Sequence, residues 1–128
     1  MNELASIRQV ADHFAVPVST LHYWERRGLI TASRRSGHRY YDRDQVYRIA
    51  LIQRWRGTGR LPIDEIATAL ATEDWREIVT ARIAAIESDV AQLNTARAYL
   101  RSLLECPHGN SLDHCAAFRA TVALPVPE

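Results

Sequence analysis

The most distinctive feature of the composition is the absence of lysine. All 16 basic residues are arginine; genome composition is a sufficient reason, although a guanidinium is also the better bidentate phosphate binder. No apolar stretch is long enough to span a bilayer, and the first ten residues hold no apolar signal-peptide core. We therefore expect a cytosolic protein without membrane contact.

Cysteine is also scarce. The only two, Cys106 and Cys115, lie in the short stretch "ECPHGNSLDHC" together with His108 and His114. In a cytosolic protein such a pair more often binds a metal or reacts as thiols than forms a structural disulfide. With 128 residues, 47% hydrophobic and 24% charged, the chain is typical of a globular domain with room for an extension.

Charge of either sign is unevenly distributed along the chain. Residues 1–60 hold 11 arginines and 5 acids, a net charge of +6, whereas residues 61–128 hold 5 arginines and 10 acids, a net charge of −5. A basic front half indicates that this end of the protein meets a polyanion.

Two short helices are predicted at the start of the chain. "SIRQVADHFAV" has apolar residues at helical spacing with Ser6 as N-cap, and "STLHYWERRGLI" predicts a second helix that Ser19 caps and Gly28 ends. About four residues join them, which is the helix-turn-helix pattern.

The next segment predicts a hairpin and two more helices. "ITASRRSGHRYYDRDQ" suits a short hairpin or loop around Ser36-Gly37. Asp42 or Asp44 is expected to cap the following helix, and Pro62 lies near the start of the helix after it.

From Trp75 to Leu104 the sequence contains no proline or glycine, and its apolar residues follow the 3/4 spacing of a coiled-coil seam. A helix of this length has nothing in its own chain to cover that stripe fully. We therefore predict a dimer. The seam residues are Val79, Ile83, Ile86, Val90, Leu93, Leu100 and Leu104.

Two stretches, "IRQVADHFAVPVSTLHYWERRGLI" and "RRSGHRYYDRDQVYRI", resemble the DNA-binding domain of the mercury-resistance (MerR) family of bacterial transcription regulators. "GRLPIDEIATAL" is similar to the family's second helix pair, and the long seam is similar to its antiparallel dimerisation helix. The resemblance covers about residues 5–106 and implies a mainly α fold, with a winged helix-turn-helix, a small β wing and a coiled-coil helix.

The resemblance also implies a domain organisation and a mechanism. Residues 1–73 would bind DNA, 74–105 would form the dimerisation helix, 106–119 an effector loop and 120–128 a flexible tail. The homodimer would bind double-stranded promoter DNA whose two recognition elements are too widely spaced. Effector binding would then twist and bend that DNA for RNA polymerase.

The candidate DNA contacts come from the second helix and the wing. Helix side chains away from Leu21 and Trp24 can reach bases or phosphates, and Glu25 is expected to order an arginine by an ion pair. The wing candidates resemble the family's backbone clamps. The full set is Ser19, Thr20, His22, Tyr23, Arg26, Arg34, Arg35, His38, Arg39 and Tyr41.

The cysteine loop stands where metal-responsive members of the family carry their effector site. Two thiolates alone suit linear Cu(I); tetrahedral Zn(II) would need more ligands, for which His108, His114 or a partner residue are candidates. Divalent-ion sensors of the family take a further cysteine near the start of the partner's helix, where this chain has Ala71 and Thr72. This departure counts against a zinc- or mercury-type thiolate site of the usual kind, but His108 and His114 could complete a Cys₂His₂ set, so the metal stays open between Cu(I) and Zn(II).

Other functions remain alternatives. The thiols could form a Cys106–Cys115 disulfide that senses oxidants, or the chain could be an architectural, excisionase-type DNA-binding module without a sensor. The loop could also be structural. An enzyme is not expected, because a catalytic zinc site needs an open coordination position in a cleft, and nothing in the sequence resembles a substrate pocket.

Overall fold

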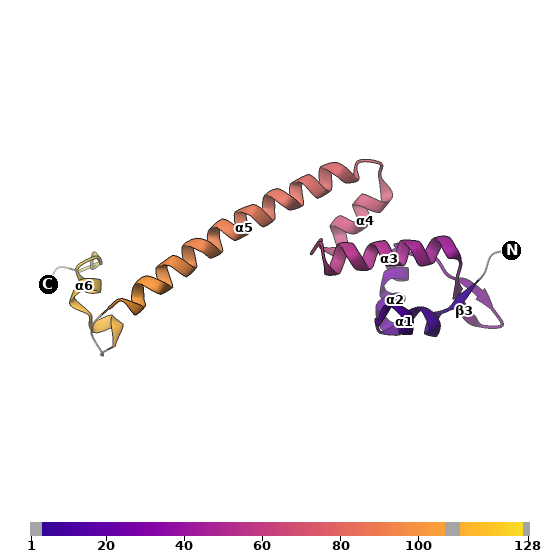
Figure 1. The fold of residues 1–128 in the computed structure, drawn as a ribbon, viewed down its shortest axis with the longest axis horizontal. Helices are drawn as coiled ribbons and strands as arrows, with labels where there is room; N and C mark the ends of the chain where they lie inside the picture. Colours follow the sequence, from indigo (N-terminus) through magenta and orange to yellow (C-terminus); the bar gives the residue numbers. More distant parts are fainter. Residues whose placement is uncertain (1–3, 107–110, 127–128) are drawn as a thin grey trace. The chain divides into compact units, whose positions relative to one another are not determined.

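A computed structural model describes residues 4–106 and 111–126, which form two compact units, Met1–Ala84 and Ala85–Glu128 (Figure 1). The elements in chain order are β1 (Ala5–Ser6), α1 (Ile7–Phe14), α2 (Val18–Arg26), β2 (Ser33–Arg35), β3 (His38–Tyr41), α3 (Arg43–Gly57), α4 (Ile63–Ala71), α5 (Trp75–Leu104), the 3₁₀ turn η1 (Leu112–His114) and α6 (Ala116–Arg119). The predicted fold class, mainly helical with a small wing and a long C-terminal helix, is confirmed.

The two helices of the helix-turn-helix begin differently. Ser6 caps α1: its hydroxyl accepts from the Gln9 backbone N–H, and the Gln9 side-chain oxygen accepts from the Ser6 N–H in a capping box. The prediction that Ser19 caps α2 is wrong, because α2 begins at Val18, two residues earlier than that cap implies, and Pro17 occupies the N-cap position. Gly28 follows α2 with φ of +72°, a left-handed conformation that lets the chain turn sharply.

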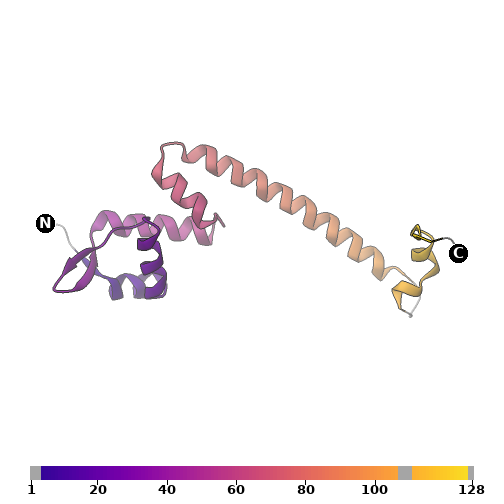
Figure 2. The ribbon, with the colours of Figure 1, turned by 180° about the vertical axis from the view of Figure 1, so that it is seen from behind.

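The wing is a three-stranded antiparallel sheet in the order β1-β3-β2. Its tip is the predicted Ser36-Gly37 turn, where φ is +51° and +79°, as a two-residue type I′ hairpin requires. The strands extend beyond the helices of their unit in both ribbon views (Figures 1 and 2). The short strand β1, which pairs Ala5 with Tyr41, was not predicted.

Unit Met1–Ala84 has a core of its own. α1, α2, β3, α3 and α4 all contribute side chains to it, and Asp42 caps α3 by accepting from the Gln45 N–H at 2.9 Å. The largest fully buried side chains are Leu21, Tyr41, Ile49, Ile52 and Ile66. This core fixes α2 and the wing relative to each other.

Helix α5 has the predicted bounds and no buried residue. Every residue of the predicted seam except Val79 is exposed, and Leu93 and Leu104 are 69% and 86% exposed. Among the described residues none buries this apolar stripe, and the dimer interface stays a prediction.

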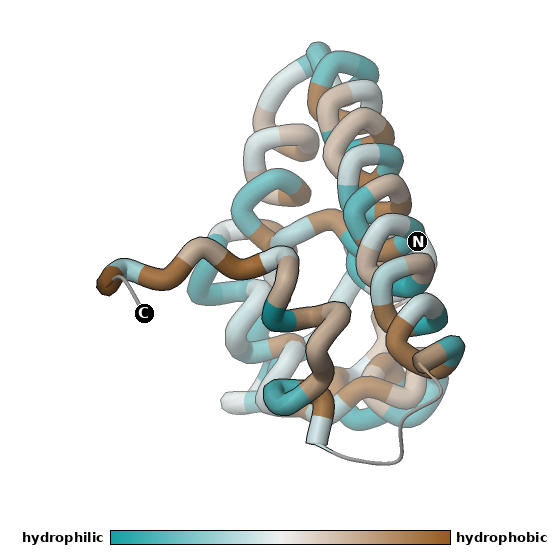
Figure 3. The backbone as a smooth tube through the Cα atoms, turned by 90° about the vertical axis from the view of Figure 1, so that its left-hand side faces the viewer, coloured by the Kyte–Doolittle hydropathy of each residue, from teal (hydrophilic) through white to brown (hydrophobic). Residues whose placement is uncertain are grey.

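The segment predicted as a loop contains structure. Within unit Ala85–Glu128, η1 and α6 follow α5, and the stretch after α6 is apolar and exposed (Figure 3). Among the described residues, none of the helices is both long and apolar enough to cross a membrane.

Candidate DNA interface and thiol site

The outward face of α2 carries the residues predicted to read DNA. Leu21 and Trp24, predicted to face inward, are 0% and 4% exposed. Of the candidates, Ser19, Tyr23 and Arg26 are exposed and Thr20 and His22 are half-buried, so all five retain contact with solvent. The core therefore presents one polar face of the helix outward.

Glu25 links this helix to the wing. Its carboxylate accepts from the Arg39 Nε at 3.0 Å and from the Tyr41 hydroxyl at 2.6 Å. The expectation that Glu25 orders an arginine is confirmed. One carboxylate on α2 thus fixes two side chains of β3, and with them the angle between helix and wing.

Tyr41 plays a different part from the other wing candidates. It is fully buried, so no atom of its side chain is accessible to a DNA strand in this structure. Burial raises the pKa of its phenol well above the ordinary value, and the hydrogen bond to Glu25 raises it further. Tyr41 is therefore placed to position Glu25 and Arg39.

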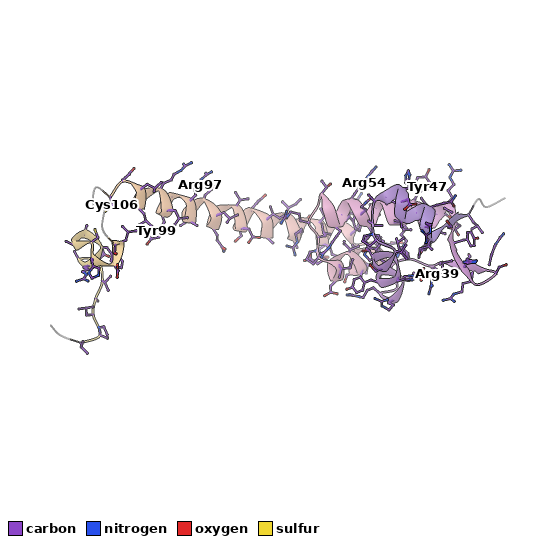
Figure 4. The ribbon with its side chains drawn as sticks, turned by 90° about the horizontal axis from the view of Figure 1, so that it is seen from below. Arg39, Tyr47, Arg54, Arg97, Tyr99 and Cys106 are labelled. Carbon is purple, nitrogen blue, oxygen red and sulfur yellow. The ribbon has the colours of Figure 1, made fainter. Side chains whose placement is uncertain are left out.

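The remaining wing candidates are accessible to solvent. Arg34, Arg35 and His38 are exposed, while Arg39 is half-buried. Arg34 pairs with Arg39, and Arg35 with His38, across the two strands. Because directly opposed residues of antiparallel strands share one face, each pair projects two basic side chains together. Arg39 is labelled in Figure 4.

A contact that sequence reasoning missed holds Tyr23. Arg27 donates to the Tyr23 hydroxyl at 3.0 Å and also forms an ion pair with Asp64 at the start of α4. The 37-residue separation between Arg27 and Asp64 leaves no periodic signal from which the pair could have been found. It joins α2 to the second helix pair.

The two cysteines converge. The Sγ atoms of Cys106, at the end of α5, and Cys115, just before α6, lie 3.8 Å apart, and both cysteines are unlinked. Cys115 is 8% exposed and Cys106 is half-buried. Hydrogen bonds from the backbone of Phe118 and Ala117, and one from the Cys106 thiol, lower the pKa of Cys115, although burial opposes them.

His114 makes its polar contacts with neighbours other than the thiols. The His114 Nδ1 lies 2.9 Å from an Arg119 guanidinium nitrogen and its Nε2 lies 3.9 Å from Asp113. His108, the other candidate ligand, falls outside the described residues. In residues 4–106 and 111–126 no group of three or more His, Cys, Asp or Glu is placed to hold one metal ion.

A helix-turn-helix braced against a small wing, followed by a long helix with an uncovered apolar stripe, defines a DNA-binding regulator. Residues 5–73 match the family described as MerR HTH family regulatory protein. The chain belongs to this family. Its members are transcription regulators, not enzymes; they bind promoter DNA and act as dimers.

Relatives with curated names agree with this assignment. The chain is 28% identical over 119 residues to HTH-type transcriptional regulator HmrR of Rhizobium leguminosarum bv. viciae, covering 86% of this chain and 92% of that protein. It is 35% identical over 100 residues to Nodulation protein NolA of Bradyrhizobium elkanii, and 76% of this chain takes part. It spans only 45% of NolA's length.

Solved structures share the fold. The transcription regulator PbrR691 from Ralstonia metallidurans CH34, solved with lead(II), has a TM-score of 0.71 at 22% identity, over 92% of this chain and 99% of that one. HiNmlR, a MerR family regulator lacking the sensor domain and bound to promoter DNA, has a TM-score of 0.56 at 16% identity, over 80% and 88% of the two chains.

Proposed function

We propose that this protein is a homodimeric, metal-responsive regulator of transcription. It binds a promoter with an over-long spacer and remodels that DNA for RNA polymerase when a thiophilic metal ion binds Cys106 and Cys115. The single observation that carries the effector part is the convergence of the two thiols at 3.8 Å, at the end of the helix expected to join the subunits.

DNA contact through α2 and the wing is supported by their geometry. The helix presents polar and basic side chains on one face, and the Glu25 hydrogen bonds brace the wing against it. In this assignment Ser19, Thr20, His22, Tyr23 and Arg26 read bases or nearby phosphates, and Arg34, Arg35, His38 and Arg39 clamp the backbone. Tyr41 acts only by positioning.

Dimerisation through α5 is supported by the exposure of its apolar stripe. Burying a leucine or isoleucine side chain stabilises an interface by about 1.5–3 kcal/mol, and the stripe repeats such residues along the helix. An antiparallel pairing of two α5 helices would cover Val79, Ile83, Ile86, Val90, Leu93, Leu100 and Leu104.

The thiol pair fits a soft metal ion. At a metal–sulfur distance of about 2.3 Å, two thiolates on one tetrahedral ion lie about 3.8 Å apart, while two on a linear ion lie about 4.6 Å apart. The free thiols of Cys106 and Cys115, 3.8 Å apart, are within about 1 Å of both separations, so small side-chain shifts would let both sulfurs bind one ion in either geometry. Zn(II) would need two further ligands, for which His108 and partner residues are the candidates. PbrR691, which shares the fold, binds lead(II).

The boundaries 1–73, 74–105, 106–119 and 120–128 describe how these roles divide along the chain in this proposal. A cytoplasmic location follows from the role, because promoter DNA and RNA polymerase are found there in bacteria.

The test is a promoter-binding experiment on the reduced, full-length dimer. Cu(I) and Zn(II) are titrated anaerobically, and both metal retention and the DNase footprint on the protein's own upstream region are measured. We expect one ion to bind and to alter the footprint in the spacer. A Cys106→Ser, Cys115→Ser variant should keep the metal-free footprint and lose the metal response, whereas Ser102→Ala, nearby on α5, should keep both.

Two results would contradict the proposal. If neither ion binds the reduced protein in a cysteine-dependent way, the metal part fails. If no footprint forms with or without metal, the assignment as a promoter-binding regulator fails for this chain.

A second candidate, thiol-redox sensing, is favoured by one observation. The lowered pKa of Cys115 increases its thiolate fraction, and Cys106 lies close enough to resolve an oxidised Cys115 to a disulfide. In that case peroxide treatment would alter the footprint in the absence of any metal, and dithiothreitol would reverse the change.

A further inference from the structure

A pocket opens beside the thiol pair. It lies within unit Ala85–Glu128, has a volume of about 580 Å³ and is bounded by the end of α5 on one side and by η1 and α6 on the other. Tyr99, Leu103, Leu112 and Phe118 supply most of its apolar wall, and Cys106 and Cys115 line it as well. Pockets of about 300–1,000 Å³ with mostly apolar walls and a few polar groups are typical of small-molecule sites.

The pocket does not coincide with the seam of α5. Tyr99 and Leu103 are four residues apart in α5, so they share one helical stripe, and Cys106 lies two residues past the end of the helix. At about 100° per residue, that stripe lies roughly 100° around the helix from the stripe of Leu93, Leu100 and Leu104. The side chains of Tyr99 and Arg97, a residue on the seam side, leave α5 in different directions in Figure 4. The pocket stripe therefore lies on a different side of α5 from the centre of the seam.

A bare metal ion uses the sulfurs and leaves this volume empty. An effector that combines a thiophilic centre with an organic group would use both. Such a ligand must place its thiophilic atom between two sulfurs 3.8 Å apart and its carbon substituent in contact with Leu103, Leu112 and Phe118.

We propose that the site accepts a trivalent organoarsenical, with arsenic bound by Cys106 and Cys115 and an aromatic substituent in the pocket. The inference rests on the proposed function, because the same thiol pair is the effector site there. It adds the ligand class and gives the apolar wall a role in selecting among ligands.

The reaction balances without an oxidant or reductant. An organoarsonous acid, R–As(OH)₂, reacts with two thiols: two As–S bonds form, two As–O and two S–H bonds break, and two water molecules leave. Arsenic remains trivalent and keeps its As–C bond, so two cysteines complete its coordination.

The test compares phenylarsonous and methylarsonous acids, which differ only in the organic group. Binding to the reduced, full-length protein is measured by loss of free thiols in competition with dithiothreitol, which corrects for the intrinsic thiol affinity of each arsenical. We expect the phenyl compound to bind at least about tenfold more tightly than the methyl compound, because a phenyl ring buries more apolar area than a methyl group.

Pocket variants locate the preference. Phe118→Ala should bring the two affinities to within about threefold while leaving methylarsonous acid bound as before. Ala117→Phe, which fills the pocket instead of emptying it, should weaken the phenyl compound alone. Leu124→Ala removes an exposed apolar side chain that does not line the pocket and should change neither affinity.

The outcomes separate this inference from the proposed function. The inference is overturned if the two arsenicals bind with equal corrected affinities, or if the phenyl preference persists in both pocket variants. The metal proposal would still stand in that case, provided that Cu(I) or Zn(II) binds in a cysteine-dependent way. If neither the ions nor the arsenicals bind through the cysteines, both fail.

Discussion

The two units of this protein differ in what holds them together. In Met1–Ala84, residues from two helix pairs and the wing enclose a core in which Leu21, Tyr41, Ile49, Ile52 and Ile66 are fully buried. In Ala85–Glu128, Cys115 is the one described residue that reaches a comparable burial, and apolar side chains along α5 and α6 are exposed. One unit is complete within a single chain, whereas the other presents its apolar surface for something else to cover.

The difference separates two sources of stability. The front unit gains its hydrophobic stabilisation on folding, so its stability belongs to the monomer. An isolated helix gains little from propensity alone, so α5 depends on covering its stripe. Because obligate dimers have a stability tied to protomer concentration, the two units should respond differently to dilution.

The largest expected effects test this contrast directly. Ile49→Ala should lower the free energy of unfolding by about 2–5 kcal/mol, since it opens a cavity in a closed core.

Leu93→Asp should weaken dimerisation about 100-fold or more, because each dimer loses two leucine contacts of about 1.5–3 kcal/mol. Urea unfolding and sedimentation measure the two quantities.

Dilution and a matched variant complete that test. The destabilisation caused by Ile49→Ala should not change with protein concentration, whereas the defect of Leu93→Asp should worsen on dilution. Ser88→Asp places the same charge on the other side of α5 and should leave the dimer intact. A dimer unaffected by Leu93→Asp would remove α5 as the seam.

The second prediction compares two wing arginines. Arg34 is exposed, whereas Arg39 forms an ion pair with Glu25, with 3.0 Å between the Arg39 Nε and a Glu25 carboxylate oxygen. If both face phosphates, Arg34→Ala should reduce the slope of log affinity against log salt by about one unit. Arg39→Ala should reduce it by less, because a neutralised cation displaces fewer counterions. Gel-shift titrations at several salt concentrations measure these slopes.

An arginine far from the wing serves as the control for that comparison. Arg101→Ala, on α5, should leave the slope unchanged. Equal reductions for Arg34→Ala and Arg39→Ala would show that Glu25 does not compete with DNA for Arg39.

Local rules predicted much of this fold from the sequence. Periodicity predicted helices α1 to α5, and turn chemistry predicted the Ser36-Gly37 turn and the helix end at Gly28, since each of these depends on neighbours along the chain. The bounds of α5 followed from the 3/4 spacing of its apolar residues within a longer segment free of proline and glycine. Strand β1 was missed because two residues carry no period, and its pairing with β3 is settled by the core.

The site was less accessible to the same reasoning. An ion pair between Glu25 and an arginine could be expected. The hydrogen bond that Glu25 accepts from Tyr41 could not, because the two residues are 16 apart in sequence and meet only when the core folds. The sequence also placed Cys106 and Cys115 near each other without showing whether their side chains meet. Convergence at 3.8 Å depends on η1 and α6, which lie in a stretch without helical periodicity long enough to detect.

The smallest expected effect comes from Tyr41 and belongs to the front unit alone. Burial raises the pKa of its phenol in the folded protein above the unfolded value of about 10, so the neutral form is favoured by folding. Its contribution to stability is fully present below about pH 10 and is lost as pH rises further, because only the unfolded chain then releases the proton. At pH 11 the loss should reach about 1.4 kcal/mol. Urea unfolding at pH 8 and 11 should show this extra loss in the native protein and not in Tyr41→Phe, and equal losses in the two proteins would mean that Tyr41 is not held neutral by the core.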